Sequence, residues 1–140
     1  MSLYLDASVL VALFVIDPAG ARAATFLSAR PAVVVVSDFG AAEFVSAVAR
    51  RVRMRELTSD DGQLAFLHFD AWVSRSASRE EIMPADIGSA DRILRRLGVN
   101  LRTPDAIHIA FSQRVRATLV TLDRGMAGAA RALGMAVATP

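Results

Sequence analysis

The chain has 140 residues, of which 54% are hydrophobic, and this length and composition predict one globular domain over residues 1–140. It contains no cysteine, which excludes disulfides, thiol nucleophiles and cysteine-based zinc sites. All 16 basic residues are arginine, so a phosphate-binding loop of the NTPase type is excluded, and the formal net charge of +2 is too small to indicate nucleic-acid binding by itself.

No segment has the pattern of a membrane span or a targeting signal. The apolar run Val9–Ile16 is far shorter than the roughly 20 residues that a transmembrane helix needs. Asp6 and Asp17 flank this run and no basic leader precedes it, which argues against a signal peptide. We therefore expect a cytoplasmic protein that does not enter a membrane.

The first half of the chain alternates between strand and helix patterns. Ser8 and Ser37 are expected to cap the helices that follow them. The β-branched run Val33–Val36 indicates a strand buried on both faces, as in a parallel sheet. Thr58 and Asp61 have the spacing of a capping box. The expected elements are a strand over 3–5, helices over 9–16 and 19–28, a strand over 33–36, and helices over 38–54 and 58–74.

The second half continues this alternation. Gly98 and Gly134 are expected to end helices, since glycine readily adopts the left-handed conformation at that position. Thr103 followed by Pro104 is typical of a helix start, with threonine as the N-cap. The expected elements are a strand over 81–83, a helix over 86–97, a helix from 103, a strand over 117–122, a helix over 125–133 and a strand over 135–138.

Strands that alternate with helices predict an α/β fold with a parallel sheet of about five strands, flanked by helices. The helices over 38–54 and 58–74 follow each other without an intervening strand. We expect this helical hairpin, about residues 38–74, to project from the sheet. Ligands bind at the carboxyl ends of the strands in open sheets of this class, so polar residues at strand ends are the first candidates for a site.

Four acidic residues occupy positions that favour such a site. Asp6 and Asp123 each follow a predicted strand, and Asp105 lies at the start of a helix. Glu43 is the only charged residue in the middle of the 38–54 helix. Each residue also has an ordinary interpretation. The aspartates are favoured at helix starts, and Glu43 could reach solvent from the edge of an apolar stripe.

The joint pattern of these four residues points to a metal. If the strands over 3–5 and 117–122 are neighbours, the four carboxylates can converge at one edge of the sheet. Carboxylates this close repel each other, and some would take up protons unless a cation is present. Oxygen ligands without histidine or cysteine suit Mg²⁺ or Mn²⁺, which can activate water for attack on a phosphodiester. The predicted metal ligands are Asp6, Glu43, Asp105 and Asp123.

Four stretches of the sequence carry a family resemblance. They are Tyr4–Ser8 (YLDAS), Glu43 in a helix of small residues, Arg102–Ala110 (RTPDAIHIA) and Val120–Asp123 (VTLD). In this order and spacing they resemble the motifs of PIN-domain proteins. Over essentially its whole length, the chain resembles the VapC toxins of bacterial toxin–antitoxin pairs. One departure is Met126, where many relatives carry an aromatic residue.

The resemblance implies a PIN-like three-layer fold and an endoribonuclease that depends on Mg²⁺ or Mn²⁺. It implies that Asp6, Glu43, Asp105 and Asp123 are the catalytic acidic quartet, with Ser8 and Thr121 supporting the site through their hydroxyls. It also implies a homodimer and an RNA substrate cleaved to a 3′-hydroxyl and a 5′-phosphate. The expected partner is a VapB-type antitoxin that wraps the hairpin and blocks the acidic site.

Several further side chains are candidates for a supporting role. Arg50 lies two helical turns beyond Glu43 on nearly the same face, within a basic run over 50–55, and suits a phosphate next to the cleaved one. Arg102 belongs to a second, sparser group of arginines. Contact with an acidic partner and simple solvation of the helix end are the alternatives for the basic run. His108 is expected to be a packed, hydrogen-bonded histidine, a support for the acidic site or a substrate contact.

Two other functions fit the same residues. A PIN-type nuclease of RNA processing or decay would share the acidic site but would have no antitoxin. A non-catalytic module that binds RNA or protein would use the carboxylates only as helix caps and would bind no Mn²⁺. A phosphoryl-accepting domain built on Asp6 is disfavoured, because such a domain needs a lysine and this chain has none.

Overall fold

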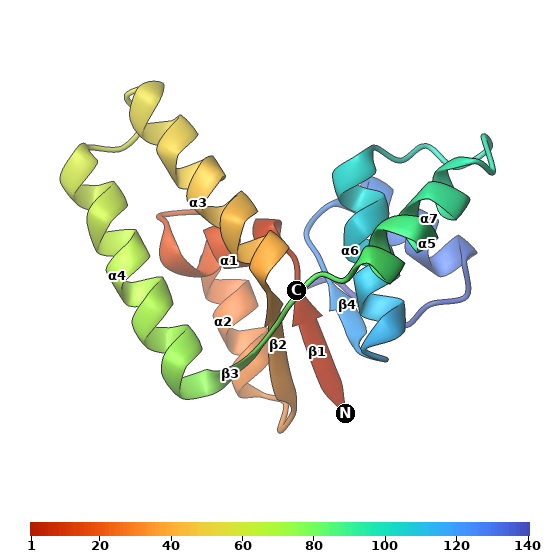
Figure 1. Ribbon diagram of the computed structural model, residues 1–140. Helices are drawn as coiled ribbons and strands as arrows, with labels where there is room; N and C mark the ends of the chain where they lie inside the picture. Colours follow the sequence, from red (N-terminus) through yellow and green to blue (C-terminus); the bar gives the residue numbers. More distant parts are fainter.

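A computed structural model describes residues 1–140, and its five strands form a single parallel sheet (Figure 1). The strand order is β3-β2-β1-β4-β5, so β1 lies at the centre. All four neighbouring pairs are parallel, which confirms the predicted sheet. The strands are β1 (Ser2–Leu5), β2 (Val33–Ser37), β3 (Ala77–Glu80), β4 (Thr118–Val120) and β5 (Val137–Ala138).

Helices cover both faces of the sheet and complete three layers (Figure 1). Successive side chains of a strand point to opposite faces. Leu3 and Leu5 of β1 accordingly pack into the core formed with the first four helices, whereas Tyr4 packs into the core formed with the last three. The helices are α1 (Ala7–Phe14), α2 (Gly20–Ser28), α3 (Asp38–Arg53), α4 (Ser59–Ser76), α5 (Pro84–Leu94), α6 (Thr103–Arg114) and α7 (Arg124–Ala132). None of them is both long and apolar enough to cross a membrane.

The predicted helical hairpin is formed by α3 and α4, which lie side by side and extend beyond the sheet (Figure 1). Phe44 of α3 packs against Phe66 and Phe69 of α4, with ring centroids 6.3 and 4.5 Å away. The caps are those expected from the sequence: Ser37 Oγ accepts a hydrogen bond from the Gly40 amide, and Thr58 forms a capping box. The aromatic contacts therefore hold together two helices that start at well-defined residues.

The third strand was expected over residues 81–83 but lies at Ala77–Glu80, directly after α4. It is an edge strand, paired only with β2. An edge strand does not need apolar residues on both faces, and Arg79 and Glu80 are exposed. The prediction of this strand was wrong by about four residues, because it relied on the apolar side chains of Ile82 and Met83.

Three predicted helix ends also differ from the structure. Asp6, and not Ser8, is the N-cap of α1, because its carboxylate accepts the Val9 amide at 3.1 Å. The N-cap of α6 is Arg102, one residue before the predicted Thr103. Helix α5 ends at Leu94, and the left-handed residue beyond it is Leu97, with φ 55°, in place of Gly98. Leu97 is 92% exposed, so no apolar contact extends the helix that far.

Candidate active site

Strands β1 and β4 are neighbours, as the acidic site requires. Leu5 pairs with Val120 in a parallel register, so the next residues of both strands leave the same edge of the sheet. The Asp6 amide continues the ladder by donating to the Val120 carbonyl at 3.2 Å. The predicted adjacency of these two strands is therefore confirmed, and Asp6 and Thr121 lie side by side at the carboxyl edge.

The carboxylate of Asp6 is buried and its orientation is fixed. The Thr121 hydroxyl donates to Oδ2 at 2.6 Å, and the Ser8 hydroxyl donates to Oδ1 at 2.6 Å. Only 3% of the residue is exposed. Burial raises the pKa of the Asp6 carboxyl, and the hydrogen bonds from Ser8 and Thr121 oppose this rise. The two hydroxyls predicted to support the site thus both contact Asp6.

The backbone of Leu122 and Asp123 is connected to Asp6 through the same two hydroxyls. The Asp123 amide donates to Thr121 Oγ1 at 2.9 Å, and the Leu122 amide donates to Ser8 Oγ at 3.0 Å. The carboxylate of Asp123 caps α7 by accepting the Met126 amide at 2.8 Å, and the residue is exposed to solvent. The loop after β4 therefore holds Asp123 at the same edge of the sheet as Asp6, with the second oxygen of its carboxylate free of protein partners.

Glu43 contacts the site through a histidine. Its carboxylate lies 2.5 Å from Nε2 of His108, which comes from α6 on the opposite side of the sheet. His108 is 3% exposed, and its ring also packs against Phe39. The expected packed, hydrogen-bonded histidine is therefore confirmed, and its partner is Glu43, one of the four predicted acidic residues.

A buried hydrogen-bond chain continues from His108 into the core. Nδ1 of His108 is 2.7 Å from the Tyr4 hydroxyl, which is 2.8 Å from Ser37 Oγ, the cap of α3. Burial raises the pKa of Tyr4 far above its ordinary value, so the phenol stays protonated. Tyr4 was not singled out in the sequence, although a tyrosine in an apolar strand signals a hydroxyl that needs a partner.

Replacement of Tyr4 by phenylalanine tests this chain. The variant leaves Nδ1 of the buried His108 without its partner, and we expect a loss of about 1–3 kcal/mol in the free energy of unfolding. Urea denaturation measures this loss. Ser76→Ala, which removes an exposed hydroxyl at the end of α4, is the control and should change little. Equal stability of Tyr4→Phe and the native protein would contradict the role given to the hydroxyl.

Asp105 lies in the first turn of α6, as predicted. Its carboxylate accepts the Arg102 amide at 3.1 Å, and the Arg102 guanidinium is 3.9 Å away. Its side chain is 18% exposed. Since His108 lies one turn further along the same helix, α6 presents Asp105 next to the contact between His108 and Glu43. Arg102 therefore lies beside an acidic residue of the site, with 84% of its own side chain exposed.

Arg50 forms no ion pair with any of the four acidic residues. It is exposed on the last turns of α3 and lines a small hollow of about 310 Å³ with Arg51 and Glu56. Its neighbour Arg51 lies in the larger cleft that Ser8 also lines. Of these two neighbouring arginines of α3, Arg51 lines the larger cleft and Arg50 does not.

The donor set suits a divalent cation by its chemistry. Asp6, Glu43, Asp105 and Asp123 offer only carboxylate oxygens, and the raised pKa of Asp6 reflects a buried charge that a cation would stabilise. In the arrangement described, no group of three or more acidic or histidine side chains lies close enough to hold one ion. Glu43 and Asp105 instead face His108 and the Arg102 amide.

Comparison with known proteins identifies the family. The sequence model of the PIN-domain family matches residues 3–132 of this chain. The chain is 35% identical to Ribonuclease VapC46 of Mycobacterium tuberculosis, over 99% of this chain and 98% of that protein.

Solved structures show the same fold at lower identity. The chain superposes with a TM-score of 0.71 on VapC20 of M. tuberculosis, described as a sarcin–ricin loop cleaving toxin, at 17% identity over 95% of both chains. It superposes with a TM-score of 0.73 on a chain of VapBC2 from Rickettsia felis bound to a promoter DNA fragment, at 16% identity over 100% of this chain and 99% of that one. The family match over most of the chain and the identity to VapC46 lead to one conclusion: this protein belongs to the PIN-domain family and is a relative of its VapC ribonucleases.

Proposed function

We propose that this protein is a metal-dependent endoribonuclease and the toxin of a VapBC-type toxin–antitoxin pair. The observation that carries the proposal is the fixed carboxylate of Asp6, held by Ser8 and Thr121 at the carboxyl edge where Asp123 also lies. This arrangement occurs in a chain that matches a VapC ribonuclease over nearly its full length. The substrate would be RNA, cleaved at a phosphodiester bond.

In this proposal the four carboxylates, Asp6, Glu43, Asp105 and Asp123, would hold Mg²⁺ or Mn²⁺. When bound, the ion would acidify water and neutralise charge on the phosphodiester. Ser8 and Thr121 keep both oxygens of Asp6 oriented, which limits the reorganisation that binding requires. His108 orients the Glu43 carboxylate through its Nε2 atom. The Tyr4 hydroxyl in turn fixes the orientation of the His108 imidazole.

The proposed partner is a VapB-type antitoxin. Support comes from the similarity in fold to chains of VapBC2 and of a toxin–antitoxin complex from Klebsiella pneumoniae. The hairpin of α3 and α4 also carries exposed Leu64 and Leu67. Exposed apolar side chains of this kind favour a protein contact over solvent. A homodimer in the cytoplasm is the assembly that we propose for the toxin, on the basis of the resemblance to VapC proteins.

The function is tested by incubating the purified protein with total cellular RNA. Cleavage is expected in Mg²⁺ or Mn²⁺ and should stop when EDTA is added in excess. Sequencing of the product ends would identify the cleaved sites and should find 5′-phosphates. Activity that persists in EDTA would rule out the metal-dependent mechanism, and absence of cleavage under all ionic conditions would rule out the nuclease.

Binding of Mn²⁺ is expected to stabilise the fold. An ion that binds only the native state at 100 times its dissociation constant adds about 2.7 kcal/mol to the free energy of unfolding. This gain should appear as a rise in melting temperature when Mn²⁺ is added. Asp6→Asn and Asp105→Asn should each make that rise smaller. Asp70→Asn, on the exposed surface of α4, serves as the control. An equal rise in all four proteins would place the ion outside the acidic site.

A non-catalytic binding module is the second candidate function. It is favoured by one observation: Asp6, Asp105 and Asp123 each accept a backbone amide at the start of a helix, so capping alone accounts for part of their position. Calorimetric titration with Mn²⁺ separates the two functions, because carboxylates that only cap helices should bind no ion. A nuclease without an antitoxin would be recognised by the absence of a small antitoxin gene next to its own.

A further inference from the structure

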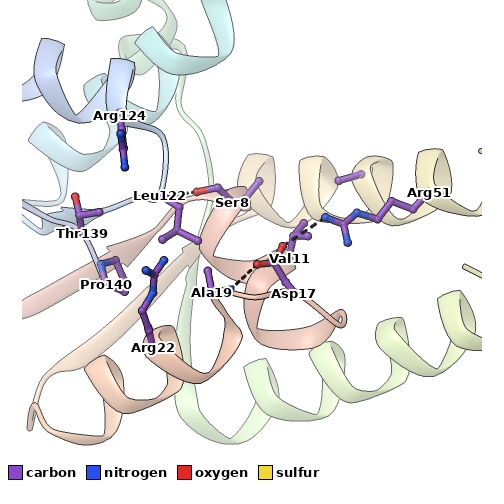
Figure 2. Close-up of a pocket in the computed structure, with 12 residues that line it drawn as sticks. Ser8, Val11, Asp17, Ala19, Arg22, Arg51, Leu122, Arg124, Thr139 and Pro140 are labelled. Carbon is purple, nitrogen blue, oxygen red and sulfur yellow. Dashed lines mark hydrogen bonds and ion pairs between the residues drawn. The ribbon is translucent and has the colours of Figure 1, made fainter. Parts of the chain in front are cut away.

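A cleft of about 650 Å³ is lined by Ser8 and by three arginines (Figure 2). Ser8 of α1 lines the cleft and also donates a hydrogen bond to the Asp6 carboxylate at 2.6 Å. The arginines come from separate helices: Arg22 from α2, Arg51 from α3 and Arg124 from the first residue of α7. The fold thus gathers basic side chains at one end of the carboxyl edge.

The three arginines differ in how their charge is balanced. Arg51 is 3.5 Å from Asp17 and 3.9 Å from Glu56, so its guanidinium is paired within the protein. Arg22 and Arg124 take part in none of the six ion pairs of the structure. Figure 2 shows these two side chains extending toward each other from opposite sides of the cleft. Two unpaired guanidinium groups that face one space favour an anion between them.

The position of the cleft indicates which anion it would take. Arg124 follows Asp123 directly in the sequence, and Ser8, which lines the cleft, is hydrogen-bonded to Asp6. An RNA chain with one phosphodiester at the acidic site must pass its neighbouring phosphates over the adjoining surface. Guanidinium groups bind phosphate oxygens through paired, charge-assisted hydrogen bonds, and their positive charge offsets the repulsion that the acidic residues exert on RNA.

We propose that Arg22 and Arg124 together bind a phosphodiester of the RNA that neighbours the cleaved one. This inference rests on the nuclease function proposed above and extends it, because it names the residues that hold the substrate outside the acidic site. It replaces Arg50 as the arginine expected to contact this phosphate. Arg51 is assigned a different part: it is neutralised by Asp17 and forms the wall of the cleft along α3.

The test is the binding of a fluorescein-labelled 12-nucleotide RNA in EDTA, where no cleavage takes place, followed by fluorescence anisotropy. We expect the double variant Arg22→Ala/Arg124→Ala to bind about tenfold or more weakly. The slope of log affinity against log salt should also fall by about 0.7, the value for one phosphate contact in a single strand. Arg22→Lys, which keeps the charge, should retain most of this slope.

The matched control is Arg75→Ala/Arg79→Ala, which also removes two positive charges, from exposed positions on α4 and β3 outside the cleft. Its RNA affinity should stay within twofold of the native value. Equal losses of affinity in this control and in the double cleft variant would overturn the inference, since net charge alone would then explain binding. Unchanged affinity of the double variant, with its fold verified by circular dichroism, would overturn it as well.

An acidic segment of a partner protein is the competing occupant of the cleft. An oligoglutamate of 12 residues that binds as tightly as the RNA, with the same dependence on Arg22 and Arg124, would overturn the RNA assignment. Cleavage assays in Mg²⁺ separate this inference from the function itself. Normal RNA cleavage with unchanged binding in the double variant rejects only the phosphate site. Arginine-dependent binding without cleavage by the native protein rejects only the nuclease.

Discussion

Replacement of Asp6 by asparagine is expected to lower Mg²⁺-dependent RNA cleavage by at least about 100-fold, because residues that merely support a metal ligand already contribute 10- to 100-fold. The variant keeps the size of the side chain and one acceptor oxygen for the Val9 amide. It removes the charge that an ion would bind and replaces one acceptor with an amide group that faces a hydroxyl. The initial rate of cleavage of a defined RNA is the measurement.

The control for this prediction is Asp70→Asn, which removes one negative charge from the exposed surface of α4. It should cleave RNA at the native rate. Undiminished cleavage by Asp6→Asn would mean that the carboxylate at the end of β1 takes no part in the reaction. Far-ultraviolet circular dichroism of both variants ensures that a lost rate is not a lost fold.

The Asp6→Asn variant is also expected to change the pH dependence of the free energy of unfolding. Burial raises the folded-state pKa of Asp6 above its unfolded value, so ionisation of this group favours the unfolded chain. Its contribution to stability is therefore largest below the ordinary pKa of an aspartate and decreases as pH rises through the folded-state pKa. We expect Asp6→Asn to remove this decrease, which urea denaturation at a series of pH values would measure in the absence of divalent ions.

Replacement of Arg114 by methionine is expected to cost about 3 kcal/mol of folding free energy. The guanidinium of Arg114 donates to the Asp86 carboxylate at 2.8 Å and to the Glu81 carbonyl at 2.8 Å. Asp86 is 1% exposed, so the variant leaves a buried carboxylate without its counter-charge. This loss lies at the lower end of the range for buried ion pairs that lose one partner. The reason is that the Arg114 side chain is 29% exposed, so water can partly replace it.

A double-mutant cycle isolates this pair. Arg114→Met should cost much less in a protein that already carries Asp86→Asn, because no buried charge is then left unpaired. Arg75→Met, on the exposed face of α4, should change stability by under about 0.5 kcal/mol. Additive losses in the Asp86→Asn/Arg114→Met protein would contradict the pairing. The cycle matters for the site because this ion pair connects α5 to α6, the helix that presents Asp105 and His108.

Sequence patterns were reliable where local chemistry decides the structure. The β-branched run in β2, the serine cap of α3 and the capping box of α4 each depend on residues within a few positions of one another. The predicted position of the third strand was wrong because it depends on a contact between remote parts of the chain. Its location at Ala77–Glu80 is decided by pairing with β2, which lies some forty residues earlier in the chain. An edge strand of polar residues carries no local signal of that pairing.

The acidic residues show the same division. Their presence at strand ends and helix starts follows from the sequence, and so does the family that their order resembles. Only the tertiary structure places the hydroxyls of Ser8 and Thr121 on Asp6, because β1 and β4 become neighbours over more than a hundred residues of chain. The link from Glu43 through His108 to Tyr4 likewise joins three elements that are remote in sequence.

The cleft with Arg22 and Arg124 belongs wholly to the tertiary structure. In the sequence these two arginines are ordinary members of surface helices, and the basic run over 50–55 is the more conspicuous feature. Charge density along a chain does not reveal which charges are neutralised once it folds. Arg51 of that run is paired with Asp17 in the cleft, whereas Arg22 and Arg124 line the same cleft without forming an ion pair. The sequence alone determined the fold class, the family and the acidic residues, because these depend on local pattern and order. The tertiary structure decided which side chains meet, because contacts between remote elements are set by strand pairing and helix packing.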